Sequence, residues 1–241
     1  MSMLRFERVT MQFGGLTAVN SLDLEIGKGQ ILGLIGPNGA GKSTAFNCAA
    51  GVYKPTMGKV YFDGEDITGA KPWDLCRKGL ARTFQIVKPF ATKTVLYNTT
   101  VAAFATTNSR EEAESIALDV LKKMHLDHRK DALSGALTIA DRKRLEIAKA
   151  MATRPKLLLL DEVMAGLRPT EVDEMIDVFK GIRESGVTIF VIEHIMRAIM
   201  ALSDELVVIH FGTKISEGKP EDVAQDEKVI KAYLGGDYVA S

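Results

Sequence analysis

The chain has no excess of charge of either sign, because 31 Lys and Arg residues balance 31 Asp and Glu residues among 241. Nucleic-acid-binding domains are usually basic, so this balance argues against a nucleic-acid partner. Long apolar runs are missing too, and no stretch approaches the roughly 20 residues that a helix needs to cross a bilayer. Residues 1–5 lack the form of a signal peptide. We therefore expect a soluble protein that reaches a membrane only through a partner.

Cysteine is also scarce, with Cys48 and Cys76 as its two occurrences. Two cysteines without metal-ligand spacing exclude a zinc module or a disulfide framework, and indicate reduced, packed thiols in a cytosolic protein. Apolar residues, by contrast, make up 46% of the sequence. That fraction over this length is enough for one α/β domain with a sizeable core.

One glycine-rich stretch carries most of the functional information. It has the G-x-x-x-x-G-K-S pattern of a phosphate-binding (Walker A) loop and follows an apolar run at 30–35 that predicts a buried parallel strand. Backbone N–H groups of such a loop surround phosphate oxygens at a helix N-terminus. Lys42 would reach the outer phosphates, and the Ser43 hydroxyl would ligate Mg²⁺. We expect a nucleoside triphosphate to be bound by Gly36, Pro37, Asn38, Gly39, Ala40, Gly41, Lys42, Ser43 and Thr44.

An acidic pair follows a second apolar run. Four leucines at 157–160 predict a strand buried on both faces, with Asp161 and Glu162 at its carboxyl end. This is a Walker B pattern, in which Asp161 can hold Mg²⁺ and Glu162 can take a proton from an attacking water. A solvated acidic turn would explain the pair alone, but not its combination with the phosphate loop.

The remaining pattern predicts a P-loop α/β core with an antiparallel β region and an inserted helical subdomain. Antiparallel strands are expected at 4–10 and 22–26, and residues from about 88 to 152 look helical. We predict one domain over 1–241, with its core at 1–87 and 154–241 and the helical subdomain at 88–153. The other expected elements are strands at 59–62, 157–161, 187–192 and 205–210, and helices at 44–50, 72–78, 171–184 and 195–202.

In this order, the motifs resemble the nucleotide-binding subunit of ATP-binding cassette (ABC) transporters, over essentially the whole chain. The resemblance implies that Phe13 stacks on adenine and that Val19 also lies at the nucleotide. It implies that Gln85 touches Mg²⁺ and the attacking water and senses the membrane partner. It makes Glu162 the catalytic base and places His194 on the γ-phosphate.

Several stretches look like the importers of branched-chain and other hydrophobic amino acids, a group that includes urea and amide importers. They are residues 13–19, 82–85, 144–148, 192–194 and 229–235. The last of these is also similar to the lipopolysaccharide-export ATPase. The resemblance therefore implies import of hydrophobic amino acids or related small amides, with lipopolysaccharide-type export as the alternative.

Two registers compete for the family's Leu-Ser-Gly-Gly-Gln signature. Leu133–Leu137 is closer in composition, but only Leu137–Asp141 leads in step into the helix-like run at 142–150, so we adopt the second register. There Thr138 keeps a hydroxyl for a γ-phosphate, and Ala140 keeps its N–H but adds a Cβ. Asp141 replaces a neutral glutamine. At about 4 Å from a triphosphate its repulsion would reach roughly 4 kcal/mol at an effective dielectric of about 20, unless it caps the helix and turns away.

The D-loop departs from the family as well, since Arg168 stands where an aspartate or asparagine is usual. In this family each ATP lies between the Walker motifs of one subunit and the signature of another. We therefore expect a heterodimer with a second cassette and two unequal ATP sites, with a homodimer as the alternative. The further partners implied are integral-membrane permease subunits and, through them, an extracytoplasmic substrate-binding protein.

The expected function is ATP hydrolysis, with ATP and Mg²⁺ bound, at the inner face of the cell membrane. The catalytic residues would be Glu162, His194, Gln85 and Lys42, with Ser43, Gln85 and Asp161 at the metal. A soluble ABC ATPase acting on DNA or ribosomes would usually carry two cassettes or a long coiled-coil insert, and neither is present. A regulatory subunit that hardly turns over is favoured by the altered signature and opposed by the intact Glu162 and His194.

Overall fold

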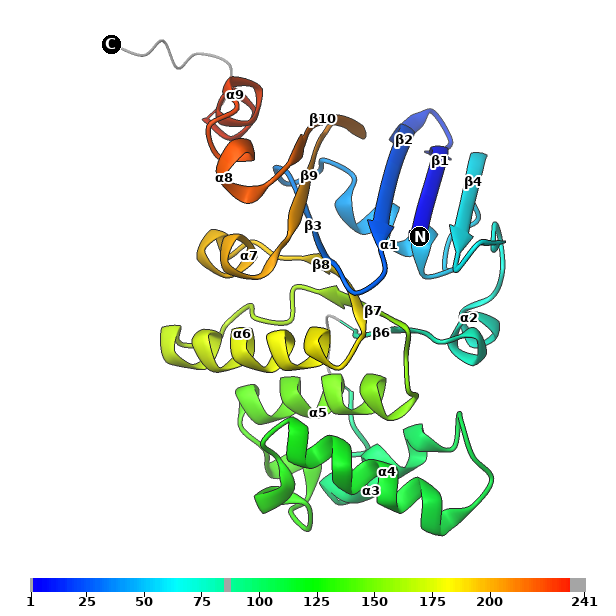
Figure 1. Ribbon diagram of the computed structural model, residues 1–241, viewed down its shortest axis with the longest axis vertical. Helices are drawn as coiled ribbons and strands as arrows, with labels where there is room; N and C mark the ends of the chain where they lie inside the picture. The colour runs from blue at the N-terminus through cyan, green and yellow to red at the C-terminus, as the bar shows by residue number, and fades with distance from the viewer. Residues whose placement is uncertain (1, 85–87, 235–241) are drawn as a thin grey trace.

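Two sheets and a set of helices make up the computed structural model, which describes residues 2–84 and 88–234 (Figure 1). The first sheet is antiparallel, in the order β2-β1-β4-β5. Its first two strands in the sequence form a long hairpin closed by a turn at 14–15, as the strand pattern predicts. The strands are β1 (Ser2–Phe13), β2 (Leu16–Gly27), β4 (Met57–Phe62) and β5 (Glu65–Asp66).

The second sheet has six strands in the order β10-β9-β3-β8-β7-β6, parallel except at the β9–β10 edge. The strands are β3 (Ile31–Ile35), β6 (Leu80–Arg82), β7 (Leu157–Asp161), β8 (Thr188–Ile192), β9 (Glu205–His210) and β10 (Thr213–Gly218). Ile192 pairs with Asp161 on one side, and Leu34 pairs with Ile192 on the other. This register brings the phosphate loop, Glu162 and His194 to one edge of the sheet.

Both faces of the parallel sheet are covered, because side chains of a strand alternate between its faces. On β7, Leu158 and Leu160 join one buried cluster, while Leu157 and Leu159 join the other. The antiparallel sheet and α1 (Lys42–Ala49) cover the second face. The other core helices are α2 (Pro72–Lys78), α6 (Pro169–Glu184), α7 (Met196–Leu202), α8 (Pro220–Val223) and α9 (Glu227–Leu234).

Three helices between β6 and β7 pack together as a unit at one end of the molecule (Figure 1). They are α3 (Val95–Ala103), α4 (Arg110–Lys123) and α5 (Ile139–Ala152), with short 3₁₀ turns η1 (Asp127–Arg129) and η2 (Ser134–Ala136). The hydroxyl of Ser109 caps α4, and the apolar face of that helix is buried as its spacing predicts. Within the described residues, no helix is both long and apolar enough to cross a membrane.

The predicted fold class is confirmed. The expected bounds of α2, β7 and β9 agree with the structure residue by residue. The pattern missed β5, β6, β10, α8 and α9. β6 is only three residues long, and β10 is a polar edge strand with no buried residue, so neither shows the apolar run or the alternation that reveals a strand.

Candidate nucleotide site

The phosphate loop leaves β3 and enters α1 through backbone positions that only glycine fits. Gly41 has φ 102°, and a Cβ there would lie 2.2 Å from the carbonyl oxygen of Ala18. A Cβ on Gly36 would lie 2.1 Å from the carbonyl oxygen of Ile209. The close approach of β2 and β9 to the loop therefore explains these two glycines, and fixes the direction of its N–H groups.

Lys42 lies inside the loop and is 6% exposed. Its Nζ donates to the carbonyl oxygens of Gly36 at 2.7 Å and Pro37 at 3.0 Å. Burial lowers the pKa of Lys42, while the charges of Glu162 and Asp161 act to raise it. A positive charge with little water around it is thus held where the loop gathers phosphate oxygens.

A hollow of about 360 Å³ opens in front of the loop. Phe13 stands at its wall, 42% exposed and with its ring edge-to-face against Tyr53 at 5.3 Å between centroids. Leu16 and Ala18 also line it, although no sequence motif marks either of them as a nucleotide contact. The other lining residues are Asn38, Gly39, Ala40, Gly41, Lys42, Ser43, Thr44, Glu162 and His194.

Some of the expected nucleotide contacts do not line this hollow, among them Val19, Gly36 and Pro37. Val19 is fully buried among core residues and does not line the hollow, because it is the inward residue of β2, next to the more exposed Ala18. Gly36 and Pro37 contribute their carbonyl groups to Lys42. The expectation for Gln85 lies outside the described residues.

Glu162 and His194 meet across the sheet edge. The Nε2 atom of His194 donates to Oε1 of Glu162 at 2.6 Å, and the imidazole is half-exposed. Glu162 has φ 50°, a left-handed conformation that is uncommon outside glycine and that clusters at functional sites. Its own N–H donates to the carbonyl of Ile192 at 2.9 Å. The turn after β7 is therefore held against the end of β8.

Asp161 and Ser43 line a neighbouring hollow of about 580 Å³ together with Arg82 and Lys149. Asp161 is 8% exposed, and burial, followed by the charge of Glu162, raises its pKa. A buried carboxylate beside a second acidic group and a hydroxyl is a donor set that suits Mg²⁺, which prefers oxygen ligands. Ser43 and Asp161 thus fit a magnesium ion.

Thr138 is the N-cap of α5, and its hydroxyl accepts the N–H of Asp141 at 3.1 Å. The carboxylate of Asp141 lies 3.9 Å from Arg144, so this side chain is turned toward the helix flank and does not itself cap the helix. The competing Ser134 is fully buried, and its hydroxyl accepts from Asn98 at 2.8 Å and donates to the carbonyl of Lys93. A hydroxyl used in this way is not presented to a ligand.

Arg168 begins α6. Its backbone N–H donates to Oε2 of Glu171 at 2.8 Å, and its guanidinium donates to Oε1 of the same residue at 2.9 Å. The arginine side chain is 79% exposed. Exposed pairs of this kind contribute little to stability, so the residue is free to serve a surface contact.

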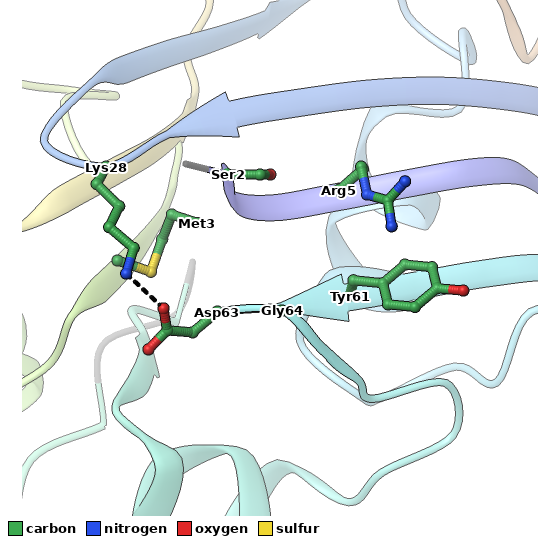
Figure 2. Close-up of a pocket in the computed structure, with 7 residues that line it drawn as sticks. All are labelled: Ser2, Met3, Arg5, Lys28, Tyr61, Asp63 and Gly64. Atoms are coloured by element: carbon green, nitrogen blue, oxygen red, sulfur yellow. Dashed lines mark ion pairs between the residues drawn. The ribbon is translucent and has the colours of Figure 1, made fainter.

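A further hollow, of about 280 Å³, lies on the antiparallel sheet (Figure 2). Both of its cationic side chains are already paired, Arg5 with Glu7 and Lys28 with Asp63 at 2.7 Å. Lys156 reaches the same Asp63 carboxylate at 2.8 Å. Hydrogen bonds from these two lysines lower the pKa of Asp63 to about 2. This hollow on the antiparallel sheet shares no lining residue with the hollow at the phosphate loop.

Comparison with known proteins agrees with this geometry. Residues 19–165 match the family described as ABC transporter, and residues 213–239 match the one described as branched-chain amino acid ATP-binding cassette transporter. The high-affinity branched-chain amino acid transport ATP-binding protein BraF of Pseudomonas aeruginosa is 40% identical, over 96% of this chain and 97% of its own length. LivG of Escherichia coli, with the same description, is 39% identical over 97% and 98%.

Solved structures show the same fold. The crystal structure of a nucleotide-free ATP-binding cassette from an ABC transporter superposes with a TM-score of 0.89 at 30% identity, over 98% of this chain and all of that one. The ADP conformation of the cassette MJ1267 gives the same TM-score at 31% identity, over 98% and 99%. With its phosphate loop, acidic pair and histidine assembled at one sheet edge, the chain belongs to the ATP-binding subunits of the ABC transporter family.

Proposed function

We propose that ATP hydrolysis by this ABC ATPase powers the import of branched-chain or other hydrophobic amino acids through a membrane permease. The observation that carries the hydrolytic part is the Glu162–His194 contact at the hollow in front of the phosphate loop. The transported class is supported by the names of the relatives, BraF and LivG. Export of a lipid-like substrate is the alternative that transport assays would test.

In the proposed reaction, the loop N–H groups and Lys42 hold the phosphates of ATP. A water oxygen bonds to the γ-phosphorus as the bond to the bridging oxygen of ADP breaks. The water proton passes to Glu162, whose carboxylate His194 orients through Nε2. ADP and inorganic phosphate are the products. Mg²⁺, held by Ser43 and Asp161, would neutralise charge on the phosphoryl oxygens.

We further propose that Thr138 and Ala140 complete the site of a second cassette. Neither residue lines the hollow at the phosphate loop of its own chain. A related cassette, 25% identical with a TM-score of 0.80, is described as dimeric in a post-hydrolysis state with ADP and phosphate. A heterodimer with unequal sites fits the altered signature and Arg168, and a homodimer is the competing arrangement.

The test is the ATPase rate per molecule of the purified chain as a function of protein concentration. A flat, near-zero rate that rises when a second cassette and permease are added supports the heterodimer. A rate that rises with concentration of the chain alone supports the homodimer. Hydrolysis that is unchanged by Glu162→Gln in both preparations contradicts the proposed site.

The register of the signature can be tested with a pair of hydroxyl deletions. Ser134→Ala removes a buried hydroxyl with two partners and should lower the free energy of unfolding by about 1–3 kcal/mol without changing kcat in the active dimer. Thr138→Ala should lower kcat, while Thr138→Ser should restore it. Urea unfolding and phosphate release measure the two effects. If Ser134→Ala lowered kcat and Thr138→Ala did not, the signature hydroxyl would have to be assigned to Ser134.

We place the permease contact on the face formed by Arg82, Phe84 and the helical subdomain at 88–153. Phe84 is 57% exposed, and Tyr97 of α3 and Phe104, the C-cap of that helix, are also exposed. Apolar side chains gathered on an otherwise polar surface are typical of protein contacts. The chain would then sit on the inner face of the membrane, with an extracytoplasmic binding protein supplying the substrate to the permease.

A further inference from the structure

A buried carboxylate adjoins the Glu162–His194 pair. Glu193 lies between β8 and His194 and is 2% exposed. Its Oε1 accepts the backbone N–H of Met164 at 2.7 Å. A carboxylate is costly to bury unless it is paired and hydrogen-bonded. Glu193 has such a hydrogen bond, because it accepts from the backbone N–H of Met164, two residues beyond Glu162.

A lysine from another element reaches the same segment. Lys143, on α5, is half-buried, and its Nζ donates to the carbonyl oxygen of Glu162 at 3.4 Å. Burial lowers the pKa of Lys143, and the carboxylate of Glu193 is the strongest influence opposing that change. Burial raises the pKa of Glu193, which the N–H groups of Met164 and His194 and the charge of Lys143 oppose. The positive charge of Lys143 and the negative charge of Glu193 therefore each favour the ionised form of the other, beside residues 162–164.

The segment between them is strained and held on several sides. Glu162 has φ 50°. Its N–H donates to the carbonyl of Ile192, and its carbonyl accepts from Lys143. The N–H of Met164, two residues further on, donates to Glu193. A sparsely populated backbone conformation persists only where the surroundings over-determine it. Two of these three contacts come from charged side chains, on different elements.

We propose that Glu193 and Lys143 are positioning residues for hydrolysis. They fix the backbone of residues 162–164, and so the direction of the Glu162 carboxylate. They also make that direction depend on the place of α5, the helix that Thr138 caps. This inference rests on the proposed role of Glu162 as the base, and it assigns to two hydrogen bonds made by charged side chains the task of coupling the position of α5 to the catalytic carboxylate.

Amide hydrogen exchange of the full chain tests the structural half without any turnover. Glu193→Ala should raise exchange at Met164 at least about tenfold, because the acceptor is lost, whereas Glu193→Gln keeps an acceptor and should stay within about threefold of wild type. Equal exchange at residues 162–167 in wild type and Glu193→Ala would overturn the proposal, whatever the ATPase assay shows.

Kinetics of the active assembly test the other half. Glu193→Ala and Lys143→Met each remove one hydrogen bond to residues 162–164 and should each lower kcat about tenfold with KM for ATP within about twofold, whereas Glu193→Gln, which keeps an acceptor, should stay near the wild-type kcat. Glu193→Ala and Lys143→Met both release the same backbone turn, so the double variant should lose far less than the roughly hundredfold product of the two. The matched control is Lys214→Met with Glu217→Gln, an ion pair on β10 remote from Glu162, which should leave kcat unchanged.

The outcomes separate the two proposals. Independent, multiplicative losses from the two single variants, or losses in KM alone, would overturn the positioning role. A wild-type rate that persists in Glu162→Gln would instead remove the proposed base, while the exchange data would still decide whether Glu193 holds Met164.

Discussion

Glu162→Gln should lower kcat for ATP hydrolysis at least about a hundredfold, which is the lower end of what a general base contributes. The amide has the shape of the carboxylate and can still accept the hydrogen bond from His194, which the structure places at 2.6 Å. It cannot take a proton from water near neutral pH. Because Lys42 and the loop N–H groups are untouched, the affinity for ATP should change by less than about twofold.

Phosphate release and equilibrium binding of ATP measure these two quantities separately. Glu184→Gln is the matched control, since this residue is exposed at the last turn of α6 and should leave both unchanged. Retention of full hydrolysis by Glu162→Gln would show that the proton leaves by another route. Loss of ATP binding together with hydrolysis would show that the substitution disturbed the strained turn and not the base.

The phosphate loop could be predicted from the sequence because its chemistry is local. The spacing from Gly36 to Ser43 sets a turn, a cation and a helix start within one segment, and the structure places them accordingly. The Walker B strand was equally accessible, since four consecutive buried leucines leave one place for Asp161. The same locality explains why α2 and β7 could be bounded correctly.

The meeting of Glu162 and His194 depended on strand order, which no local pattern contains. Resemblance to a family supplied it, and the pairing of β7 with β8 accounts for it physically. The left-handed conformation of Glu162 and the burial of Glu193 were not predictable, since both arise from contacts between distant segments. A glutamate next to a histidine normally suggests an exposed polar turn.

The signature illustrates the opposite difficulty. Composition favoured Ser134, and only the phase of the following helix favoured Thr138. The structure gives a reason to prefer the register that contains Thr138, because Thr138 caps α5, while the hydroxyl of Ser134 is hydrogen-bonded to Asn98 and to the carbonyl of Lys93. The repulsion envisaged for Asp141 is reduced if its carboxylate stays beside Arg144, as it does here. The altered signature is therefore compatible with turnover in the second cassette's site that we propose it completes.

Lys42→Met should weaken ATP binding about 10- to 100-fold and abolish measurable hydrolysis at cellular ATP concentrations. Hydrogen bonds to charged groups contribute about 1.5–3 kcal/mol, and each 1.4 kcal/mol corresponds to a factor of ten in affinity. Methionine keeps the buried stem of Lys42, so the loss isolates the ammonium group, which is held between two loop carbonyls at 2.7 and 3.0 Å. Calorimetric titration with ATP measures the change.

Two comparisons distinguish a lost phosphate contact from a collapsed loop. Lys122→Met on α4 removes an exposed lysine of the helical subdomain and should bind ATP as the wild type does. Affinity for adenosine, which has no phosphate, should be equal in Lys42→Met and wild type if only the charge was lost, because Phe13 and its neighbours remain in place. A parallel fall in adenosine affinity would mean that the two carbonyls, left without their donor, had let the loop rearrange.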